Sequence, residues 1–99
     1  MREAEIVKKI LKYLKKLEGC FCWKEHGGMY GRAGIPDIIC CYLGHFFGFE
    51  VKTVTGQATE LQKATMKKIN QAGGTAVIVR SLEEVKSVLE KAVKDEKKS

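Results

Sequence analysis

The sequence lacks a long apolar run, and this absence excludes a membrane-spanning helix. Such a helix needs about 18 or more apolar residues in succession, whereas charged residues interrupt the apolar stretches of this 99-residue chain well before that length. The first five residues, Met1–Glu5, are charged and lack the apolar core of a secretory signal. We therefore expect a cytosolic protein without a membrane partner.

The chain also lacks the CxxC spacing of zinc ribbons and thioredoxin-like redox sites. Its four cysteines occur as a CxC pair and a CC pair, Cys20/Cys22 and Cys40/Cys41, in apolar strand-like segments. Buried thiols behave as small hydrophobic side chains, and the cytosol keeps them reduced. A zinc site that adds His26 and His45 is the alternative, although the spacing does not favour it.

The charge is not balanced: 18 basic residues face 12 acidic ones, which gives a net charge of +6. A basic protein favours an anionic partner, and nucleic acid is the common one. The alternative is a solvated, lysine-rich surface. A glycine-rich loop, Gly27–Gly34, precedes a strand rather than a helix, so it is not a phosphate-binding P-loop, and we expect no small-molecule cofactor.

Periodicity and turn residues predict one domain over residues 1–93, followed by a charged, disordered tail at 94–99. Pro36, the single proline, suits the start of a strand. The sequences after Thr59 and Ser81 have the form of helix capping boxes. The expected elements are a helix at 3–18, strands at 20–26, 37–43, 46–54 and 75–80, and helices at 60–72 and 82–93. This α-β-β-β-α-β-α order predicts an α/β fold with a mixed four-stranded sheet flanked by helices.

Three charged residues carry the candidate chemistry. Residues two apart on a strand face the same side, so Glu50 and Lys52 project together. Asp37 opens the preceding strand, and a tight turn at Gly44-His45 would bring its carboxylate near Glu50. Two convergent carboxylates suit a hard cation such as Mg²⁺. The alternative is a cross-strand ion pair, with Asp37 as an ordinary turn residue.

The motifs occur in an order that resembles a known family. They are Glu3-Ala4-Glu5-Ile6, Gly34-Ile35-Pro36-Asp37, Glu50-Val51-Lys52, Gly56 and Gln62. Together they resemble the short, stand-alone VRR-NUC proteins, often found in phages, of the PD-(D/E)xK nuclease superfamily. The resemblance spans about residues 3 to 90. It implies a restriction-endonuclease-like fold. It also implies that the protein is located in the cytosol of a bacterium or a phage-infected host.

The resemblance also implies an activity and a set of site residues. The activity is endonucleolytic cleavage of DNA that depends on Mg²⁺ or Mn²⁺, with branched DNA such as Holliday junctions among the substrates of relatives. Asp37 and Glu50 would bind the metal and Lys52 would act in catalysis. Gln62 would lie near the same site, although it is equally well explained as the capping-box partner of Thr59.

The superfamily uses a glutamate of the first helix as well, and this chain has two candidates. Glu3 lies three residues before Ile6 and so continues the apolar stripe, whereas Glu5 lies four residues before Lys9 on the outward face. We therefore expect Glu3 to face the sheet and to join the metal site.

Two residues of the glycine-rich loop are candidates for contact with DNA. Arg32 is expected to bind a phosphate, and Tyr30 is expected to lie against the nucleic acid. The chain is also expected to form a homodimer, because its central strands are apolar on both faces and Trp23, Tyr30 and Tyr42 suit an interface. The alternative function is a non-catalytic module that binds nucleic acid with a nuclease-like fold.

Overall fold

A computed structural model describes residues 1–26 and 31–98. The elements are α1 (Glu3–Leu14), β1 (Cys20–Lys24), β2 (Ile38–Tyr42), β3 (His45–Val51), α2 (Glu60–Gln71), β4 (Thr75–Val79) and α3 (Leu82–Lys98). Within the described ranges, no helix is long and apolar enough to cross a membrane. The predicted α/β class and order of elements are confirmed.

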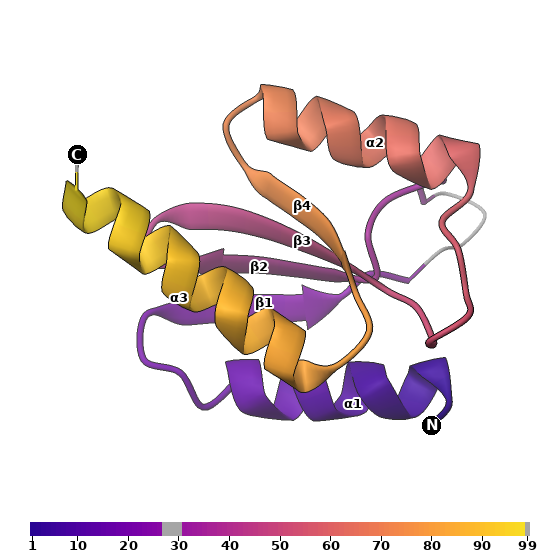
Figure 1. Cartoon of the computed structure of the whole chain (residues 1–99), viewed down its shortest axis with the longest axis horizontal. Helices are drawn as coiled ribbons and strands as arrows, with labels where there is room; N and C mark the ends of the chain where they lie inside the picture. Colours follow the sequence, from indigo (N-terminus) through magenta and orange to yellow (C-terminus); the bar gives the residue numbers. More distant parts are fainter. Residues whose placement is uncertain (27–30, 99) are drawn as a thin grey trace.

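The four strands form one mixed sheet in the order β1-β2-β3-β4. The β1/β2 and β2/β3 pairs are antiparallel, whereas β3 and β4 run parallel. Helices α1 and α3 lie on one face of the sheet and α2 lies on the other (Figure 1). The parallel pair requires the crossover that α2 provides, and this connection leaves β1 and β4 as the two edges.

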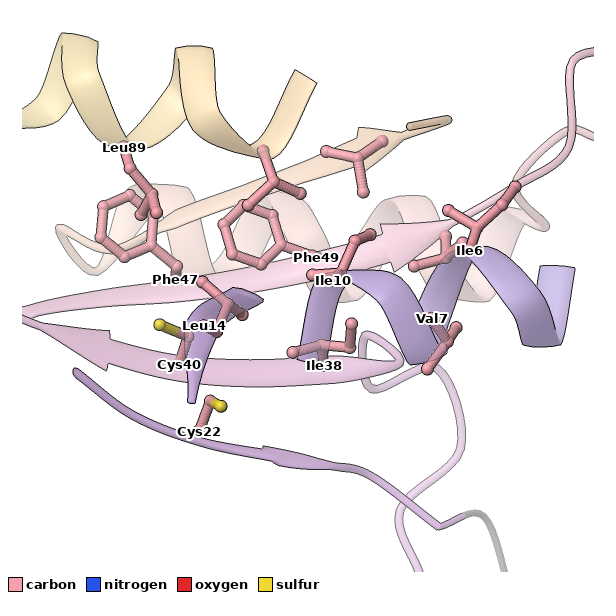
Figure 2. Close-up of a cluster of buried hydrophobic side chains, with 13 residues drawn as sticks. Ile6, Val7, Ile10, Leu14, Cys22, Ile38, Cys40, Phe47, Phe49 and Leu89 are labelled. Atoms are coloured by element: carbon pink, nitrogen blue, oxygen red, sulfur yellow. The ribbon is translucent and has the colours of Figure 1, made fainter. Parts of the chain in front are cut away.

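The main core lies between the sheet and the pair α1 and α3 (Figure 2). Alternate residues of β3 point into it, so Phe47, Phe49 and Val51 are fully buried. The apolar stripe of α1 covers them with Ile6, Val7, Ile10 and Leu14, and α3 adds Val85 and Leu89. Each fully buried side chain of this size stabilises the fold by about 1.5–3 kcal/mol.

The turn of the β2–β3 hairpin differs by one residue from the prediction. It is formed by Leu43 and Gly44, with φ of 51° and 83°, and His45 already belongs to β3. Two successive positive φ values match the type I′ turn, whose twist suits a two-residue hairpin. The predicted turn at Gly44-His45 is therefore wrong.

Several predicted boundaries also differ. The first helix ends at Leu14 rather than near residue 18, and a turn leads to Gly19, whose φ is 79°. The strand predicted at 46–54 ends at Val51, because the chain turns at Val54 and Thr55. In contrast to the tail expected after residue 93, α3 continues to Lys98. Residues 94–98 contain no proline or glycine, and Glu90 and Lys94 have the spacing that supports a helix.

A close packing contact connects β3 to the segment that carries Asp37. Gly48 lies in the middle of β3, and a Cβ atom added there would come within 2.9 Å of Cγ of Pro36 and 3.3 Å of its Cβ. Pro36 is itself buried. The absent side chain of Gly48 therefore allows the Pro36 ring to lie directly on the sheet, one residue before Asp37.

We predict that Gly48→Ala destabilises the protein by about 1–3 kcal/mol, since the methyl group must displace Pro36 or the strand. Urea unfolding of the single and double variants measures the coupling. Truncation of the ring in Pro36→Ala should reduce the cost of Gly48→Ala. An equal cost with and without the proline ring would contradict the proposed contact.

Candidate metal and phosphodiester site

The β2–β3 hairpin places Asp37 across from Glu50. The pairs Ile38/Phe49 and Ile39/Gly48 fix the register of the hairpin, and the next position in the same register pairs Asp37 with Glu50. Directly opposed residues of antiparallel strands have Cβ atoms about 4.5–5.5 Å apart on one face. This face is the one on which α2 lies, since Gln62 of α2 contacts Glu50. The side chains of Phe49 and Val51 alternate with Glu50 along β3 and point to the opposite face.

The carboxylate of Asp37 is held by the backbone of β3. Its Oδ2 atom accepts a hydrogen bond of 2.8 Å from the N–H of Val51. The backbone carbonyl of Asp37 accepts a 2.7 Å hydrogen bond from the N–H of Glu25, just beyond the end of β1. Asp37 therefore cannot leave the sheet without breaking bonds on both sides, and its carboxylate remains beside Glu50.

Glu50 is a buried carboxylate, with 1% of the residue exposed. Its Oε2 atom accepts a hydrogen bond of 3.2 Å from Nε2 of Gln62 and lies 3.3 Å from Nζ of Lys52. Its Oε1 atom is buried and has no hydrogen-bond partner within the described ranges. A buried carboxylate oxygen without a hydrogen-bond partner lowers the stability of the fold. The described residues alone therefore do not satisfy this oxygen.

Gln62 has two partners at once. Its side-chain Oε1 atom accepts a hydrogen bond from the backbone N–H of Thr59, and its backbone N–H donates to the Thr59 hydroxyl. These two bonds complete the predicted capping box. The Nε2 atom at the other end of the same amide donates to Glu50. The two explanations of Gln62 are therefore compatible, and α2 begins in a fixed position relative to Glu50.

The environment of Glu50 favours its protonated form. Burial is the main cause, and charge repulsion from the adjacent Asp37 carboxyl adds to it. Lys52 acts in the opposite direction. The net effect raises the pKa of Glu50 to about 7. Near neutral pH, the site therefore changes charge readily, and an added cation would favour its ionised form.

The residues present fit a hard divalent cation. Oxygen atoms from two carboxylates converge, and one of them, Oε1 of Glu50, is buried and has no partner in the part of the chain that the structure describes. Mg²⁺ is usually bound through one or two carboxylates and retains several waters. No group of three or more His, Cys, Asp or Glu residues that could hold a metal occurs in the described part of the chain. Asp37 and Glu50 are thus the candidate donors, and the described residues place no third acidic side chain with them.

The remaining predicted site residues lie outside this cluster. Glu3 and Glu5 are both exposed in the first turn of α1, so the expected contrast between them does not appear in their exposure. The start of α1 lies beside the turn that follows β3: Met1 and Ile6 line a cavity of about 240 Å³ together with Val54 and Arg80, and neither Asp37 nor Glu50 lines it.

The two residues expected to contact DNA come from the glycine-rich loop. Arg32 is exposed and lines a separate cavity on the α2 side, together with Lys68. Tyr30 falls outside the described residues.

Three of the four cysteines, Cys20, Cys22 and Cys40, pack as small hydrophobic side chains, whereas Cys41 is exposed. Cys22 and Cys40 are buried in the core, and the Sγ atoms of Cys20 and Cys40 lie 3.3 Å apart. Burial, followed by the contact with Cys20, raises the pKa of the Cys40 thiol, which therefore stays neutral.

The raised pKa of Glu50 predicts a pH-dependent stability. Between pH 4.5 and 7 the folded protein retains a proton that the unfolded chain releases, so the free energy of unfolding falls as the pH rises through this range. Glu50→Gln removes this loss and should gain up to about 3 kcal/mol relative to the wild type between pH 4.5 and 8.

Urea unfolding in a chelator at several pH values provides the measurement. Glu60→Gln is the matched control, since Glu60 is exposed at the start of α2. If the wild type and Glu50→Gln lose stability in parallel across this range, the assignment of the raised pKa to Glu50 is wrong.

Comparisons with known proteins support the fold. No family model and no curated protein matches the sequence. Among solved structures, one titled "VRR_NUC domain protein" superimposes with a TM-score of 0.75 at 22% identity, over 95% of this chain and 89% of that chain. Another, "VRR_NUC domain", gives 0.73 at 22% identity over 89% and 94%. The expected resemblance is thus confirmed in three dimensions, and this chain has the fold of a VRR_NUC domain.

Proposed function

We propose that the protein is an endonuclease that hydrolyses phosphodiester bonds of DNA with Mg²⁺ or Mn²⁺. The observation that carries the proposal is the buried carboxylate of Glu50 beside that of the partly buried Asp37, with no hydrogen-bond partner for Oε1 of Glu50 among the described residues. A carboxylate pair of this kind destabilises the protein unless a cation or a proton neutralises it. The VRR_NUC fold supports the nuclease assignment.

The residues of the site have distinct roles in this proposal. Asp37 and Glu50 hold the cation, which when bound polarises the phosphodiester and lowers the pKa of a water ligand. Lys52 supplies a positive charge where negative charge develops on the phosphorus oxygens. Gln62 keeps Oε2 of Glu50 oriented, because its amide is fixed by the capping box of α2.

Cationic residues of the α2 side would hold the DNA backbone. Arg32 and Lys68 line one cavity there, on the side of the sheet where Glu50 and Lys52 project. Phosphate contacts of this kind position a duplex without reading its sequence. We therefore assign Arg32 to DNA binding together with Lys52 and, from the sequence, Tyr30. Branched DNA such as a Holliday junction is the proposed preferred substrate.

A binding module without catalytic activity is the second candidate. It has no use for a buried Glu50 carboxylate beside a second carboxylate, because this pair weakens the attraction of the protein for phosphates. Lys52 would also bind a phosphate more freely if it did not lie 3.3 Å from Glu50. The geometry of the site therefore favours the enzyme over the module.

We predict that Asp37→Asn, Glu50→Gln and Lys52→Gln each lower the rate of DNA cleavage by a factor on the order of 10² or more, since each removes a ligand or a cation from the reacting centre. The measurement is cleavage of labelled four-way junction, flap, nicked and linear duplex DNA with Mg²⁺ or Mn²⁺. Folding of each variant is checked by circular dichroism. Wild-type rates in a folded Glu50→Gln protein would falsify the assignment.

Glu3 and Glu5 form a matched pair within the same experiment. Both are exposed in the first turn of α1 and carry the same charge, so the two substitutions change the net charge equally. We assign the third acidic position to Glu3, and Glu3→Gln should therefore reduce cleavage much more than Glu5→Gln. Equal effects of the two variants would remove Glu3 from the site.

The proposal includes a homodimer. On the edge strand β1, Phe21 and Trp23 are 70% and 43% exposed, with ring centroids 5.6 Å apart. Exposed aromatic side chains on an unpaired edge strand are typical of an interface. Tyr42, also predicted for the interface, pairs with Cys20 and packs against the core on the opposite face of the sheet, so it is not part of this aromatic patch. A twofold dimer would hold two active sites in a fixed relation, as paired incision of a junction requires.

Light scattering at micromolar concentration should give a mass twice that of the 11.1 kDa monomer. The double variant Phe21→Ser and Trp23→Ser should shift the mass to that of the monomer, because it removes the apolar edge without touching Asp37 or Glu50. A wild-type monomer with full cleavage activity would exclude both the dimer and paired incision.

A further inference from the structure

The segment between β3 and α2 connects the two residues that contact Glu50. Lys52 follows β3 directly, and Gln62 lies in the first turn of α2. Both reach the same atom, Oε2 of Glu50, at 3.3 Å and 3.2 Å. The shape of residues 53–58 therefore determines whether an ammonium group and an amide can meet at one carboxylate oxygen.

The side chain of Arg80 fixes this shape. Its Nη1 atom donates to the backbone carbonyls of Thr53, Val54 (3.3 Å) and Gly56 (2.7 Å). The turn also has a bond of its own, from the N–H of Gly56 to the carbonyl of Thr53 at 3.1 Å. Three carbonyl oxygens that converge on one point repel each other unless a cation lies between them.

Arg80 is placed for this contact by the parallel pairing of β3 and β4. The N–H of Lys52 donates to the carbonyl of Val79 at 3.0 Å, so the two strands remain bonded up to their last residues. Arg80 is the next residue after Val79, and its own N–H donates to Glu84 at the start of α3. The base of the side chain is therefore fixed, and the guanidinium reaches across the end of β3.

No carboxylate competes for the guanidinium in the residues that the structure describes, where the ion pairs are Lys52–Glu50 and Lys63–Glu60. The positive charge of Arg80 therefore interacts with the backbone carbonyl dipoles of one turn. A guanidinium remains charged at any physiological pH and has its donors in a fixed plane. Such a group suits a permanent structural contact better than a proton-transfer role.

We propose that Arg80 is a positioning residue of the active site: it holds the turn at 53–56 and thereby sets the approach of Lys52 and Gln62 to Glu50. The inference rests on the proposed nuclease function, because the effect is on the reacting geometry. Arg80 does not touch the substrate in this account. Its loss should therefore lower kcat and leave KM for DNA unchanged.

The test compares Arg80→Met and Arg80→Lys with Lys91→Met, which removes one positive charge from an exposed position of α3. Arg80→Met should lower kcat by about 10- to 100-fold, as expected for a misplaced catalytic group. Arg80→Lys and millimolar guanidinium added to Arg80→Met should each restore part of the rate. Lys91→Met should cleave like the wild type.

Wild-type kcat in folded Arg80→Met, or a defect in KM alone, would overturn the proposal; the latter would identify Arg80 as a DNA contact. If Arg80→Met does not fold, Arg80→Lys decides instead. A lower kcat that guanidinium relieves would support the proposal, and a wild-type kcat would overturn it.

Hydrogen exchange of the Gly56 amide separates this inference from the nuclease proposal. It should be faster in Arg80→Met than in the wild type, even if the wild-type protein fails to cleave DNA. Unchanged exchange would show that Arg80 does not hold the turn.

Discussion

The burial of Glu50 beside Asp37 is the interaction on which the rest of the structure depends. A carboxylate that is 1% exposed and faces a second carboxylate is unfavourable in a protein interior. The surrounding elements offset this cost in part: Val51 fixes Asp37 through its backbone, and Lys52 and Gln62 approach one oxygen of Glu50. The other oxygen has no hydrogen-bond partner among residues 1–26 and 31–98. The protein therefore gives up stability at one point of the sheet, as is common at functional sites.

Backbone pairing and one small residue hold Asp37 beside Glu50. The hairpin register sets Asp37 opposite Glu50, and Gly48 lets Pro36 lie against β3. On the other face of β3, Phe47 and Phe49 are fully buried under α1 and α3 (Figure 2). Since side chains alternate along a strand, the same seven residues of β3 supply both the core and the site.

Much of this could be predicted from the sequence, because local patterns determine it. The alternation of β3 fixes the common face of Glu50 and Lys52, and the capping-box pattern fixes the start of α2. The predicted ends of helices and strands are less accurate where no strong stop signal exists. The lysines and acidic residues after Val93 allow α3 to continue to Lys98. The hairpin turn was displaced by one residue because Leu43 adopts a positive φ, which its side chain does not suggest.

Long-range contacts could not be predicted. Nothing in the sequence near Arg80 indicates that it binds carbonyls 24 to 27 residues earlier. Likewise, the periodicity of α1 predicts which face is apolar but not how far its first turn lies from the sheet. Glu3 therefore matches the apolar stripe in sequence and is nevertheless exposed in the structure. The two contacts of the Gln62 amide, with Thr59 and with Glu50, could not be predicted either, because the second depends on the packing of α2 against Glu50.

The central claim is that Asp37 and Glu50 form the site of a divalent cation, and a paramagnetic metal tests it most directly. Titration of the protein with Mn²⁺, followed by broadening of backbone amide resonances, locates the ion without any substrate. We predict saturable broadening that begins around Asp37, Glu50 and Val51 and is lost in Glu50→Gln. Broadening that begins elsewhere, or that is the same in Glu50→Gln, would contradict the claim.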